Sequence, residues 1–421
     1  MSKSVLVVGG GGREHALCRA LSQSESIAHV HVTPGNAGTV NYATNHSISA
    51  SDVDGLLALS ETLAVDFVVV GPEAPLCDSL ADVLIEHGIP CFGPQAIHAE
   101  LEGSKRFAKE AMQRAGVPTA EYIVLDSTSD FESALVSHSD NPWVIKRDVL
   151  AGGKGVVVTT DLKEATEFIK ESIQTDGHVL LESFLPGEEA SMLVVMDASG
   201  FVCLPPSQDH KRVWDGDKGL NTGGMGAYCP APVVTEEIHH KVVERIVKPM
   251  HESLSGMDVP YRGVLYVGLM IDENGDPFVV EFNVRFGDPE CQVTLPLIAS
   301  DVGELLFAAA TDALENHSVS FHDKHCLTVV LASEGYPQSA IKNRLILGAE
   351  LADDEDNVWV SHAGTGMNDS NQLISTGGRV LATTAIAPSL SDARALSYQR
   401  MEKISLQGSH HRNDIGYRAL R

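Results

Sequence analysis

The sequence predicts a multidomain protein of mixed α/β and α+β type, which begins with an open parallel α/β sheet and ends with a small α/β closing domain. Apolar runs followed by glycine- or proline-rich loops recur near the N-terminus, which is typical of parallel strands. Beyond them, helices and short strands give way to a mostly antiparallel pattern. A chain of 421 residues is also too long for one ordinary core, so several subdomains are expected.

The first elements are a buried parallel strand, a tight turn and a helix. Val5–Val8 is a continuous apolar run that ends in four glycines, and Arg13–Ser22 then has helical spacing of its apolar residues. A strand followed by a glycine or proline loop returns at His29–Val32 and at Asp66–Val70. We therefore expect a small open α/β sheet with its loops at the carboxyl ends of the strands.

After this sheet the pattern changes to an α+β unit. Helical spacing covers Lys105–Ala115, and short strands follow at Trp143–Lys146 and Val156–Thr159. Val179–Leu185 and the hairpin-like Leu193–Val202 then begin a mostly antiparallel sheet. The remaining expected elements are strands at Val264–Ile271, Pro277–Phe282, Cys326–Leu331, Val358–His362 and Arg379–Thr384, and a helix at Ser391–Ile404.

The charge balance argues against nucleic acid as a partner. The 57 acidic and 30 basic side chains give a net charge of −27, which repels a polyanionic backbone at long range. Phosphorylated small molecules are compatible with this charge, because a local pocket of lysine, arginine or Mg²⁺ dominates within a Debye length of ~8 Å. We therefore expect small-molecule partners and no nucleic acid.

The cysteines and the hydropathy pattern indicate a cytoplasmic protein. The 7 cysteines are scattered, odd in number and without a Cys-x-x-Cys pair, so they indicate neither a disulfide framework nor a zinc site. The N-terminus runs directly into an apolar strand, unlike a signal peptide, and no apolar run is long enough to span a membrane. We expect a reducing cytoplasm and no membrane partner.

A glycine-rich segment with two lysines is the first candidate for phosphate binding. Lys146 ends an expected strand, and Leu150–Gly155 reads Leu-Ala-Gly-Gly-Lys-Gly before the next strand. Glycines let a loop backbone approach phosphate closely, and Lys146 and Lys154 supply positive charge. The segment is not a P-loop, because a glycine and a strand follow Lys154. The alternative is a hairpin turn with a solvated lysine.

Glu281, Asn283 and Arg285 occupy alternate positions of an expected strand and should share one face. Carboxylate and amide oxygens suit a Mg²⁺ ion that bridges nucleotide phosphates. An arginine suits a carboxylate or a transferring phosphoryl group. The alternative is an edge strand with a solvated charged face, but the neighbouring Phe282 and Val284 favour a buried site.

Two further segments suit the recognition of a small zwitterion. Ser207–Arg212 mixes acidic and basic side chains, and Asn221–Tyr228 is a glycine-rich turn. Asp209 is available for an ammonium group, and the backbone amides of the turn are available for a carboxylate. A plain surface loop is the alternative.

Taken in order, these pieces resemble the ATP-grasp fold, in which two α+β subdomains close on ATP. The resemblance implies that the main chain around Glu182–Leu185 receives adenine and that Glu189 binds the ribose hydroxyls. The implied nucleotide-binding residues are Lys105, Lys146 and Lys154 at the phosphates and Glu182, Phe184, Leu185 and Glu189 at the nucleoside, and the implied metal ligands are Glu281 and Asn283.

Longer motifs are similar to those of one family, the phosphoribosylamine–glycine ligases. They span nearly the whole chain in the family's order: Gly9–His15, Pro34–Gly38, Val70–Pro75, Leu101–Lys105, Ser207–Arg212, Asn221–Tyr228, Glu281–Glu290, His362–Thr365, Gly377–Leu381 and Asp414–Arg418. We accordingly expect a substrate-binding α/β domain at 1–103, a first ATP-grasp part at 104–190 with a lid at about 120–188, a central antiparallel domain with the metal site at 191–322, and a C-terminal domain at 323–421.

The family's reaction is the ATP-dependent ligation of glycine to 5-phosphoribosylamine in de novo purine biosynthesis. It gives glycinamide ribonucleotide, ADP and phosphate through glycyl phosphate. The resemblance implies a cytoplasmic carbon–nitrogen ligase, monomeric or weakly dimeric, with ATP and Mg²⁺ as cofactors and Mn²⁺ as an alternative ion. The lysine hairpin should close as a lid that excludes water.

The resemblance also assigns residues to the reaction. The first glycine loop and its helix N-terminus, with the loops at Pro34–Gly38 and Gly71–Pro75, should bind the ribose phosphate. The implied catalytic residues are Arg285, Lys154 and Asp209. The implied substrate-binding residues are Gly11, Gly12, Arg13, Glu14, Asn36, Gly38, Pro72, Glu73, Lys211, Gly224, Met225, Gly226 and Glu290.

Several positions depart from the family pattern. Arg147 replaces an alanine, Val149 a glycine and Gly152 an alanine in and around the lysine loop. Because valine avoids positive φ, Val149 is expected to stiffen the entry to the loop. Cys291 in place of threonine and Leu220 in place of proline remove no expected ligand.

Three other functions compete with this prediction. A different carboxylate–amine ligase or a carboxylase would share the nucleotide site, but Ser207–Arg212 argues against it. A nicotinamide-dependent oxidoreductase would need a third glycine where Glu14 stands, and an acidic residue after the second strand, which ends in Thr33 and Pro34. A non-catalytic nucleotide-binding module would not need lysines, metal ligands and an acceptor loop together.

Overall fold

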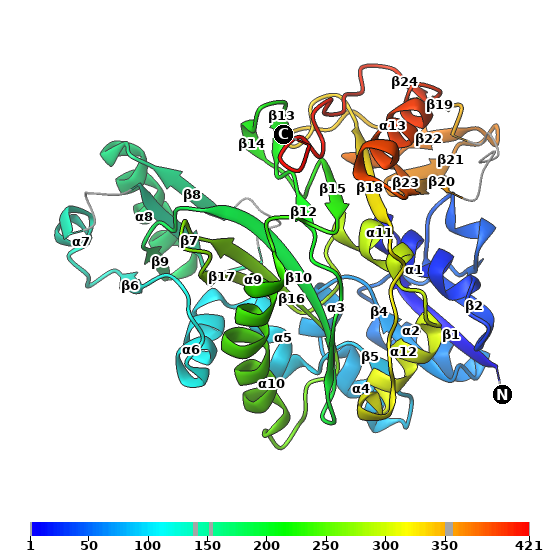
Figure 1. The fold of residues 1–421 in the computed structure, drawn as a ribbon, viewed down its shortest axis with the longest axis horizontal. Helices are drawn as coiled ribbons and strands as arrows, with labels where there is room; N and C mark the ends of the chain where they lie inside the picture. Colours follow the sequence, from blue (N-terminus) through cyan, green and yellow to red (C-terminus); the bar gives the residue numbers. More distant parts are fainter. Residues whose placement is uncertain (1, 138–141, 151–154, 350–356, 421) are drawn as a thin grey trace.

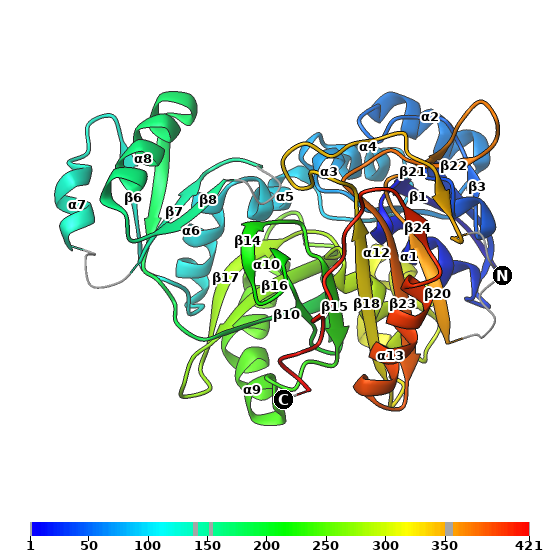
Figure 2. The same cartoon turned by 90° about the horizontal axis from the view of Figure 1, so that it is seen from above.

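The computed structural model describes residues 2–137, 142–150, 155–349 and 357–420. The segment with α7 and α8 lies at one end of the molecule, and the N- and C-terminal segments lie side by side at the other end (Figures 1 and 2). A central antiparallel sheet connects the two ends. Lys154 and Gly152 of the predicted lysine loop lie outside the described residues.

The N-terminal segment is the expected open parallel sheet, with strand order β3-β2-β1-β4-β5. Its strands are β1 (Lys3–Gly9), β2 (Ile27–Pro34), β3 (Thr44–Asn45), β4 (Phe67–Val70) and β5 (Cys91–Phe92). Its helices are α1 (Gly12–Ser22), η1 (Thr39–Asn41), α2 (Val53–Leu63), α3 (Ala74–Cys77), α4 (Leu80–Glu86) and α5 (Ala96–Gly103). The order reverses at β1, which brings the loops after β1, β2 and β4 to one edge.

The apolar run of β1 is buried on both faces, as its sequence predicts. Val5 and Val7 belong to the core cluster that contains α1, whereas Leu6 and Val8 belong to the cluster that contains α2 and α4. The carboxyl-end loops contact each other directly, since the amide of Gly35 donates to the carbonyl of Gly9 (3.1 Å).

The lid segment is an antiparallel sheet of order β6-β9-β7-β8. Its elements are β6 (Tyr122–Asp126), α7 (Phe131–Ser137), β7 (Trp143–Arg147), β8 (Val156–Thr159), α8 (Leu162–Asp176) and β9 (His178–Glu182), and the helix α6 (Lys105–Ala115) precedes them. Trp143, Ile145, Val179 and Leu181 form much of its core. The expectation that Val179–Leu185 starts the central sheet is wrong, because β9 ends at Glu182 and pairs within the lid.

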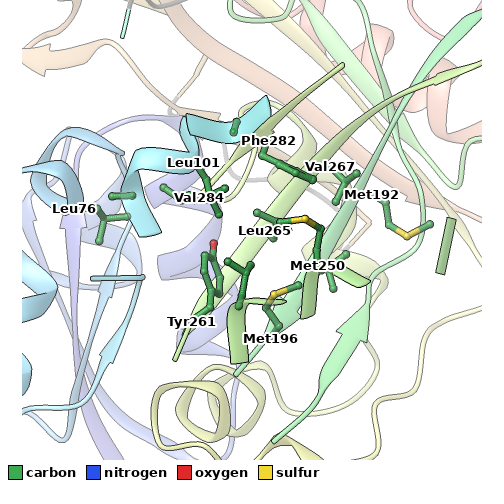
Figure 3. Close-up of a cluster of buried hydrophobic side chains, with 14 of the residues drawn as sticks. Leu76, Leu101, Met192, Met196, Met250, Tyr261, Leu265, Val267, Phe282 and Val284 are labelled. Carbon is green, nitrogen blue, oxygen red and sulfur yellow. The ribbon is translucent and has the colours of Figure 1, made fainter. Parts of the chain in front are cut away.

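The central sheet has the order β11-β10-β16-β17 and is antiparallel throughout. Its elements are β10 (Glu188–Met196), β11 (Phe201–Cys203), α9 (Glu236–Val242), η2 (Val243–Val247), α10 (Lys248–Ser255), β16 (Gly263–Ile271) and β17 (Pro277–Asn283). Figure 3 shows Leu265, Val267 and Phe282 of this sheet packed with Met250 of α10 and with Leu101 of α5. The core therefore fixes the sheet against α5, the last helix of the N-terminal segment.

The closing sheet has the order β12-β15-β18-β23-β20. Its strands are β12 (Gln208–Asp209), β15 (Gly226–Cys229), β18 (His325–Ala332), β20 (Val358–His362) and β23 (Arg379–Ala387), and α13 (Leu390–Met401) packs on it. Of the two strands from the predicted zwitterion segments, β12 thus pairs with β15, and β15 pairs with β18 of the C-terminal segment. The remaining elements are β13 (Arg212–Trp214), β14 (Lys218–Asn221), α11 (Glu290–Thr294), η3 (Leu295–Leu297), α12 (Val302–Ala310), η4 (Leu314–Asn316), β19 (Ile346–Leu347), β21 (Thr365–Met367), β22 (Leu373–Ser375) and β24 (Ser405–Leu406).

No helix in the described part of the chain has both the length and the apolar character needed to cross a membrane.

Candidate functional site

Lys105 stands at the start of α6, between the lid hairpin and β17. Ser104 caps this helix by accepting a hydrogen bond from the amide of Phe107 (3.0 Å). The Nζ of Lys105 donates to the carbonyl of Val149, at the entry to the lysine loop (3.0 Å). Burial lowers the pKa of Lys105, and the Glu281 carboxylate opposes that effect. The lysine is therefore close to both elements that were predicted to contact phosphates.

Lys146 reaches β17 from the lid. Its Nζ donates to the carbonyl of Val280 (3.1 Å) and pairs with Oε2 of Glu182 (3.0 Å). Lys109, one helical turn after Lys105, pairs with the same oxygen (2.9 Å), and burial lowers the pKa of Lys109 to about 8. The Glu182 side chain thus neutralises two buried lysines, and its Oε1 has no hydrogen-bond partner among the described residues.

The chain after β9 offers the main-chain groups expected at adenine. Ser183 still donates its amide to the carbonyl of Glu121 (2.8 Å). The amides of Phe184 and Leu185 make no hydrogen bond within the part of the chain that the structure describes, and both residues are half-buried. A planar base edge could therefore pair with this backbone without breaking a protein hydrogen bond.

Glu281 and Asn283 lie on one face of β17, and a bulge at Val280 precedes them. Asn283 Nδ2 donates to the carbonyl of Phe282 (2.7 Å), so its Oδ1 is the atom left for a metal ion. Both residues are half-buried oxygen donors of the kind that Mg²⁺ takes. Arg285 does not share this strand face, contrary to the sequence-based expectation, because β17 ends at Asn283 and the chain then bends.

Arg285 instead lies between two carboxylates from the N-terminal segment. Its Nη2 donates to Oε1 of Glu102 (2.8 Å), and its Nε lies 3.4 Å from Oε2 of Glu73. Burial alone would lower the pKa of Arg285, but Glu102 and Glu73 outweigh it and raise that pKa. The buried Nε has no hydrogen-bond partner among the described residues, so it can donate to an incoming anion.

A second charged group surrounds Asp209 at the start of the closing sheet. Lys211 Nζ pairs with Oε2 of Glu189 (3.1 Å), and Tyr266 donates its hydroxyl to Oε1 of Glu290 (3.1 Å). Burial raises the pKa of Asp209 to about 7, with Lys211 opposing the rise and Glu290 and Glu189 adding to it. Burial also raises the pKa of the Glu290 carboxyl. This group therefore holds excess negative charge that an ammonium ligand would relieve.

The glycine-rich turn before β15 has its amides occupied from Thr222 to Met225. The amide of Gly224 donates to Oγ1 of Thr222 (3.0 Å), and that of Met225 donates to the carbonyl of His210 (2.9 Å). The expectation that these amides hold a carboxylate has no support at these two residues. Close packing explains Gly226 instead, because a Cβ there would lie 2.6 Å from a backbone carbonyl of β18.

The first glycine turn is held by its own charged residues. Glu14 Oε2 accepts from the amide of Gly11 (2.5 Å), and Arg13 donates its Nε to Oε1 of Glu14 (2.6 Å) and its Nη1 to the carbonyl of Phe286 (3.1 Å). A Cβ at Gly71 would collide with Glu14. Arg13 and Glu14 are buried, so in this structure they support the turn and link it to the chain after β17.

A cavity of about 340 Å³ opens between the first glycine turn and the C-terminal segment. Asn36 spans it by donating its Nδ2 to the carbonyls of Gly10 (3.0 Å) and His362 (2.9 Å). On the opposite side, Arg379 donates its Nη2 to Oδ2 of Asp288 (3.0 Å). The lining residues are Gly10, Gly11, Gly35, Asn36, Asp288, Ala363, Gly364, Thr365, Thr376 and Arg379.

The other predicted loop residues lie beside this cavity. Gly12 packs on Gln292, since a Cβ at Gly12 would lie 2.8 Å from the Gln292 amide, and Gly38 packs on the ring of His362. Pro72 lies against the backbone of the first glycine turn. A larger cavity of about 550 Å³ lies along the far side of α1, beside Arg19 and Trp359, and none of the predicted site residues lines it.

Comparison with known proteins covers almost the whole chain. Residues 3–102, 103–291 and 326–418 match, respectively, the N, ATP-grasp (A) and C domains of phosphoribosylglycinamide synthetase. The phosphoribosylamine–glycine ligases of Xanthomonas campestris pv. campestris and Mycobacterium tuberculosis are 43% and 44% identical, with 99% of this chain and 98% of each relative covered. The chain belongs to the phosphoribosylamine–glycine ligase family.

Solved structures agree with this membership. A phosphoribosylamine–glycine ligase from Thermotoga maritima superposes with a TM-score of 0.83 at 32% identity, covering 98% of this chain and 100% of that one. The biotin carboxylase domain of the 2-oxoglutarate carboxylase from Hydrogenobacter thermophilus has a TM-score of 0.74 at 18% identity, over 98% and 92%, and shows the shared fold alone. Membership places the chain among carbon–nitrogen ligases with an ATP-grasp domain.

The structure brings many of the predicted nucleotide-, metal- and ammonium-binding residues into two neighbouring groups. Lys105 and Lys146 meet β17 from the lid side, and the group around Asp209 meets it from the closing sheet. Glu281 connects the two groups, since its charge acts on both Lys105 and Asp209. Lys154 cannot be placed, because it lies outside the described residues.

Several residues of the site were not predicted from the sequence. Lys109 follows Lys105 at helical spacing, and that spacing was a usable signal. Glu102 and Arg379 stand inside motifs that the chain shares with the family, but only their contacts with distant segments give them a role. Asp148 accepts from Oγ of Ser104 (3.1 Å), which no local pattern predicts.

Proposed function

We propose that the protein ligates glycine to 5-phosphoribosylamine, giving glycinamide ribonucleotide, ADP and phosphate through glycyl phosphate in de novo purine biosynthesis. Family membership supports the coarser statement, an ATP-dependent ligation of glycine. The observation that carries the full proposal is that both groups contact β17 beside Glu281 and Asn283: Lys146 donates to the carbonyl of Val280 (3.1 Å), and Tyr266, which pairs with Asn283, donates to Glu290 (3.1 Å). Lysines that would bind phosphates and an acidic group that would bind an ammonium thus lie beside β17, the strand that would hold the metal ion.

The nucleotide would lie between the lid and the central sheet. Lys105 and Lys146 would neutralise its phosphates, and the free amides of Phe184 and Leu185 would receive the base. Glu281 and Asn283 would hold Mg²⁺, or Mn²⁺ in its place, which when bound offsets the charge of the phosphate oxygens. The Hydrogenobacter thermophilus domain, solved in complex with MgADP, supports such a site on this fold.

The first step joins the glycine carboxylate to the γ-phosphorus of ATP, and ADP leaves with the electrons of the broken P–O bond. Asp209 would hold the glycine ammonium. The Nε of Arg285, which has an ion pair with Glu73 but no hydrogen bond among the described residues, would donate to the transferring phosphoryl group or to the carboxylate. Because both charges are placed in advance, the carboxylate and the γ-phosphate can meet with little loss of freedom.

In the second step the amine of 5-phosphoribosylamine attacks the carbonyl carbon of glycyl phosphate, and inorganic phosphate leaves. The cavity between Asn36 and Arg379 would hold the phosphosugar, because it joins the N-terminus of α1 to a half-buried arginine. The cavity borders Asp288, which lies seven residues after Glu281 in the chain. The acceptor and the acyl phosphate would therefore lie on opposite sides of the turn after β17.

The test is ADP release with ATP, Mg²⁺ and 5-phosphoribosylamine, comparing glycine with alanine and bicarbonate as the third substrate. We expect glycine alone to stimulate release, and glycinamide ribonucleotide to accumulate in equal amount. Stimulation by bicarbonate and not by glycine would instead indicate a carboxylase, and the glycine assignment would then be withdrawn.

A further inference from the structure

Glu102 contacts both ends of a short segment that the reaction depends on. Its Oε2 accepts a hydrogen bond from the amide of Val284 (2.8 Å), and its Oε1 accepts from Nη2 of Arg285 (2.8 Å). The side chain of Glu102 is 7% exposed, compared with 30% for Glu73 on the other side of the guanidinium. Glu102 is therefore the inner, fixed partner of Arg285, and Glu73 is the outer one.

The amide of Val284 is the first donor after β17, where the strand has no further partner. Glu102 thus ends the metal-binding strand and sets the direction in which the chain leaves it. The apolar neighbours reinforce this contact, because Leu101 and Val284 are buried in the same core cluster and lie side by side in Figure 3. The backbone on both sides of the carboxylate is consequently fixed by packing.

The position of Glu102 in the chain connects it to the phosphate site. It lies in the last turn of α5, two residues before Ser104, which caps α6, and three residues before Lys105. The short junction between α5 and α6 therefore positions both Lys105, which contacts the lid, and Glu102, which holds Arg285. Movement of this junction would displace both cations together.

We propose that Glu102 is a positioning residue for the ligase reaction, which is anchored at the Val284 amide and holds the Arg285 guanidinium in the orientation that phosphoryl transfer needs. This inference rests on the proposed function. Without the Glu102 carboxylate, Arg285 would turn toward Glu73, the remaining carboxylate beside it. The guanidinium would still be buried and charged, but its Nε would point away from the transferring group.

The test is the steady-state kinetics of glycine-dependent ADP release by Glu102→Gln. Because a glutamine amide cannot accept from both Val284 and Arg285, kcat should fall by about 10- to 100-fold, the range usual for residues that orient a reacting group. The KM for ATP should stay within about twofold, since the nucleotide contacts are untouched. Glu102→Asp keeps the charge but is one methylene shorter, so its kcat should be intermediate.

A double mutant separates positioning from a general loss of structure. If Glu102 acts through Arg285, Glu102→Gln added to Arg285→Lys should lower kcat no further than Arg285→Lys alone. The matched control is Asp312→Asn, which breaks the ion pair of Arg262 with Asp312 (Nε to Oδ1, 2.9 Å) away from the site. That control should lower the melting temperature and leave kcat unchanged.

The outcomes are distinguishable from failure of the proposed function. If the unmodified enzyme releases no ADP with glycine, the proposed function is wrong and the role of Glu102 falls with it. If the unmodified enzyme is active but Glu102→Gln has its full kcat, or the two losses multiply, the positioning role alone is refuted. Should Glu102→Gln not fold, Glu102→Asp decides the matter by the same comparison with Arg285→Lys.

Discussion

At Asp209, burial and charge act in opposite directions. Burial raises the pKa of this carboxyl, Lys211 lowers it, and Glu290 and Glu189 raise it again, which leaves the pKa at about 7. Such a carboxyl is divided between its neutral and ionised forms at neutral pH. An ammonium group is attracted only by the ionised form, so glycine binding should change with pH in this range.

We predict that the KM for glycine falls as the pH rises from about 6 to about 8, because ionised Asp209 becomes the main form. Asp209→Asn should raise the KM for glycine and remove its pH dependence. The KM for ATP should have the same pH dependence in Asp209→Asn as in the unmodified protein. The measurement is ADP release at saturating ATP over a series of pH values. A KM for glycine that rises with pH would contradict the assignment of Asp209.

The same pKa shift gives a separate check on stability. The folded protein binds the proton of Asp209 more tightly than the unfolded chain, whose pKa is about 3.9. The stabilisation is therefore complete below that value and is lost as the pH rises through about 7. Asp209→Asn should flatten the pH dependence of the free energy of unfolding between these two values, as measured by urea denaturation.

Glu281 is the residue on which both halves of the site depend. It is half-buried and makes no hydrogen bond or ion pair within the described residues, so its removal should cost the fold little. We predict that Glu281→Ala reduces kcat by at least about 100-fold, since a preorganised charge at the reacting group is lost, while the melting temperature stays near that of the unmodified protein. Glu304→Ala, an exposed glutamate in α12, is the control. Near-normal turnover by Glu281→Ala would remove this residue from the metal site.

Local sequence patterns predicted the residues whose role depends on one element. Lys146 and Glu281 were predictable because a glycine loop or strand alternation presents them, whereas Lys105 was implied only by the resemblance to the ATP-grasp fold. The placement of Arg285 was not, because it depends on where β17 loses its partner strand. Pairings such as Lys109 with Glu182 join residues far apart in the chain, which spacing alone cannot reveal.

At the scale of elements, the lid hairpin is tied to α6 by one carboxylate. Asp148 accepts from Oγ of Ser104 (3.1 Å) and from the amide of Arg106 (3.1 Å), and it lies 2.7 Å from Nε2 of His178. The first two contacts give the N-terminus of α6 a second cap that comes from the lid. The hairpin therefore cannot move far without exposing the helix end that carries Lys105.

We predict that Asp148→Ala loosens the lid more than it destabilises the protein. Amide hydrogen exchange should speed up in β7 and β8, and the KM for ATP should rise by about 10-fold, because an ordered lid is lost. Asp161→Ala is the matched control, since Asp161 caps α8 in the same lid without touching α6. Equal changes in the KM for ATP in both variants would show that capping in general, and not the tie to α6, controls the lid.

The types of most elements could be predicted, but their partners could not. The run at Val179–Leu185 has the composition of a strand, yet only pairing with β6 and β7 decides that it belongs to the lid and ends at Glu182. The short strands β12 and β15 carry a weak local signal, because two to four residues show little periodicity. The place of β15 beside β18, and of β12 beside β15, follows from tertiary contacts.

At the scale of the whole molecule, the N- and C-terminal segments meet around one buried histidine. His362 stacks on His15 with 5.7 Å between ring centroids, and its carbonyl accepts from Asn36 Nδ2 (2.9 Å). Burial lowers the pKa of His15 to about 3 and that of His362 to about 4, so the stacked pair is uncharged at neutral pH. Nδ1 of His362 also lies 3.1 Å from Oγ1 of Thr365, which lines the smaller cavity.

Gly38 provides the means to disturb this contact without touching the nucleotide site. Its φ of −94° suits any residue, but a Cβ there would collide with the His362 ring, which is held on its other side by His15. We predict that Gly38→Ala displaces His362 and, through its contact with Thr365, also displaces Thr365, which lines the smaller cavity. The KM for 5-phosphoribosylamine should rise by about 10-fold or more, and overpacking should cost about 1–3 kcal/mol of stability. The KM for ATP should change little.

The matched control is Gly200→Ala, because a Cβ there would meet its nearest atom at an ordinary 3.7 Å, far from the cavity. That variant should keep all three KM values. If Gly38→Ala raised the KM for ATP and for 5-phosphoribosylamine equally, the interface would support the whole enzyme and not the phosphosugar cavity in particular. A selective effect on 5-phosphoribosylamine would mean that the C-terminal segment forms one wall of the acceptor site, so that neither terminal segment could bind this substrate alone.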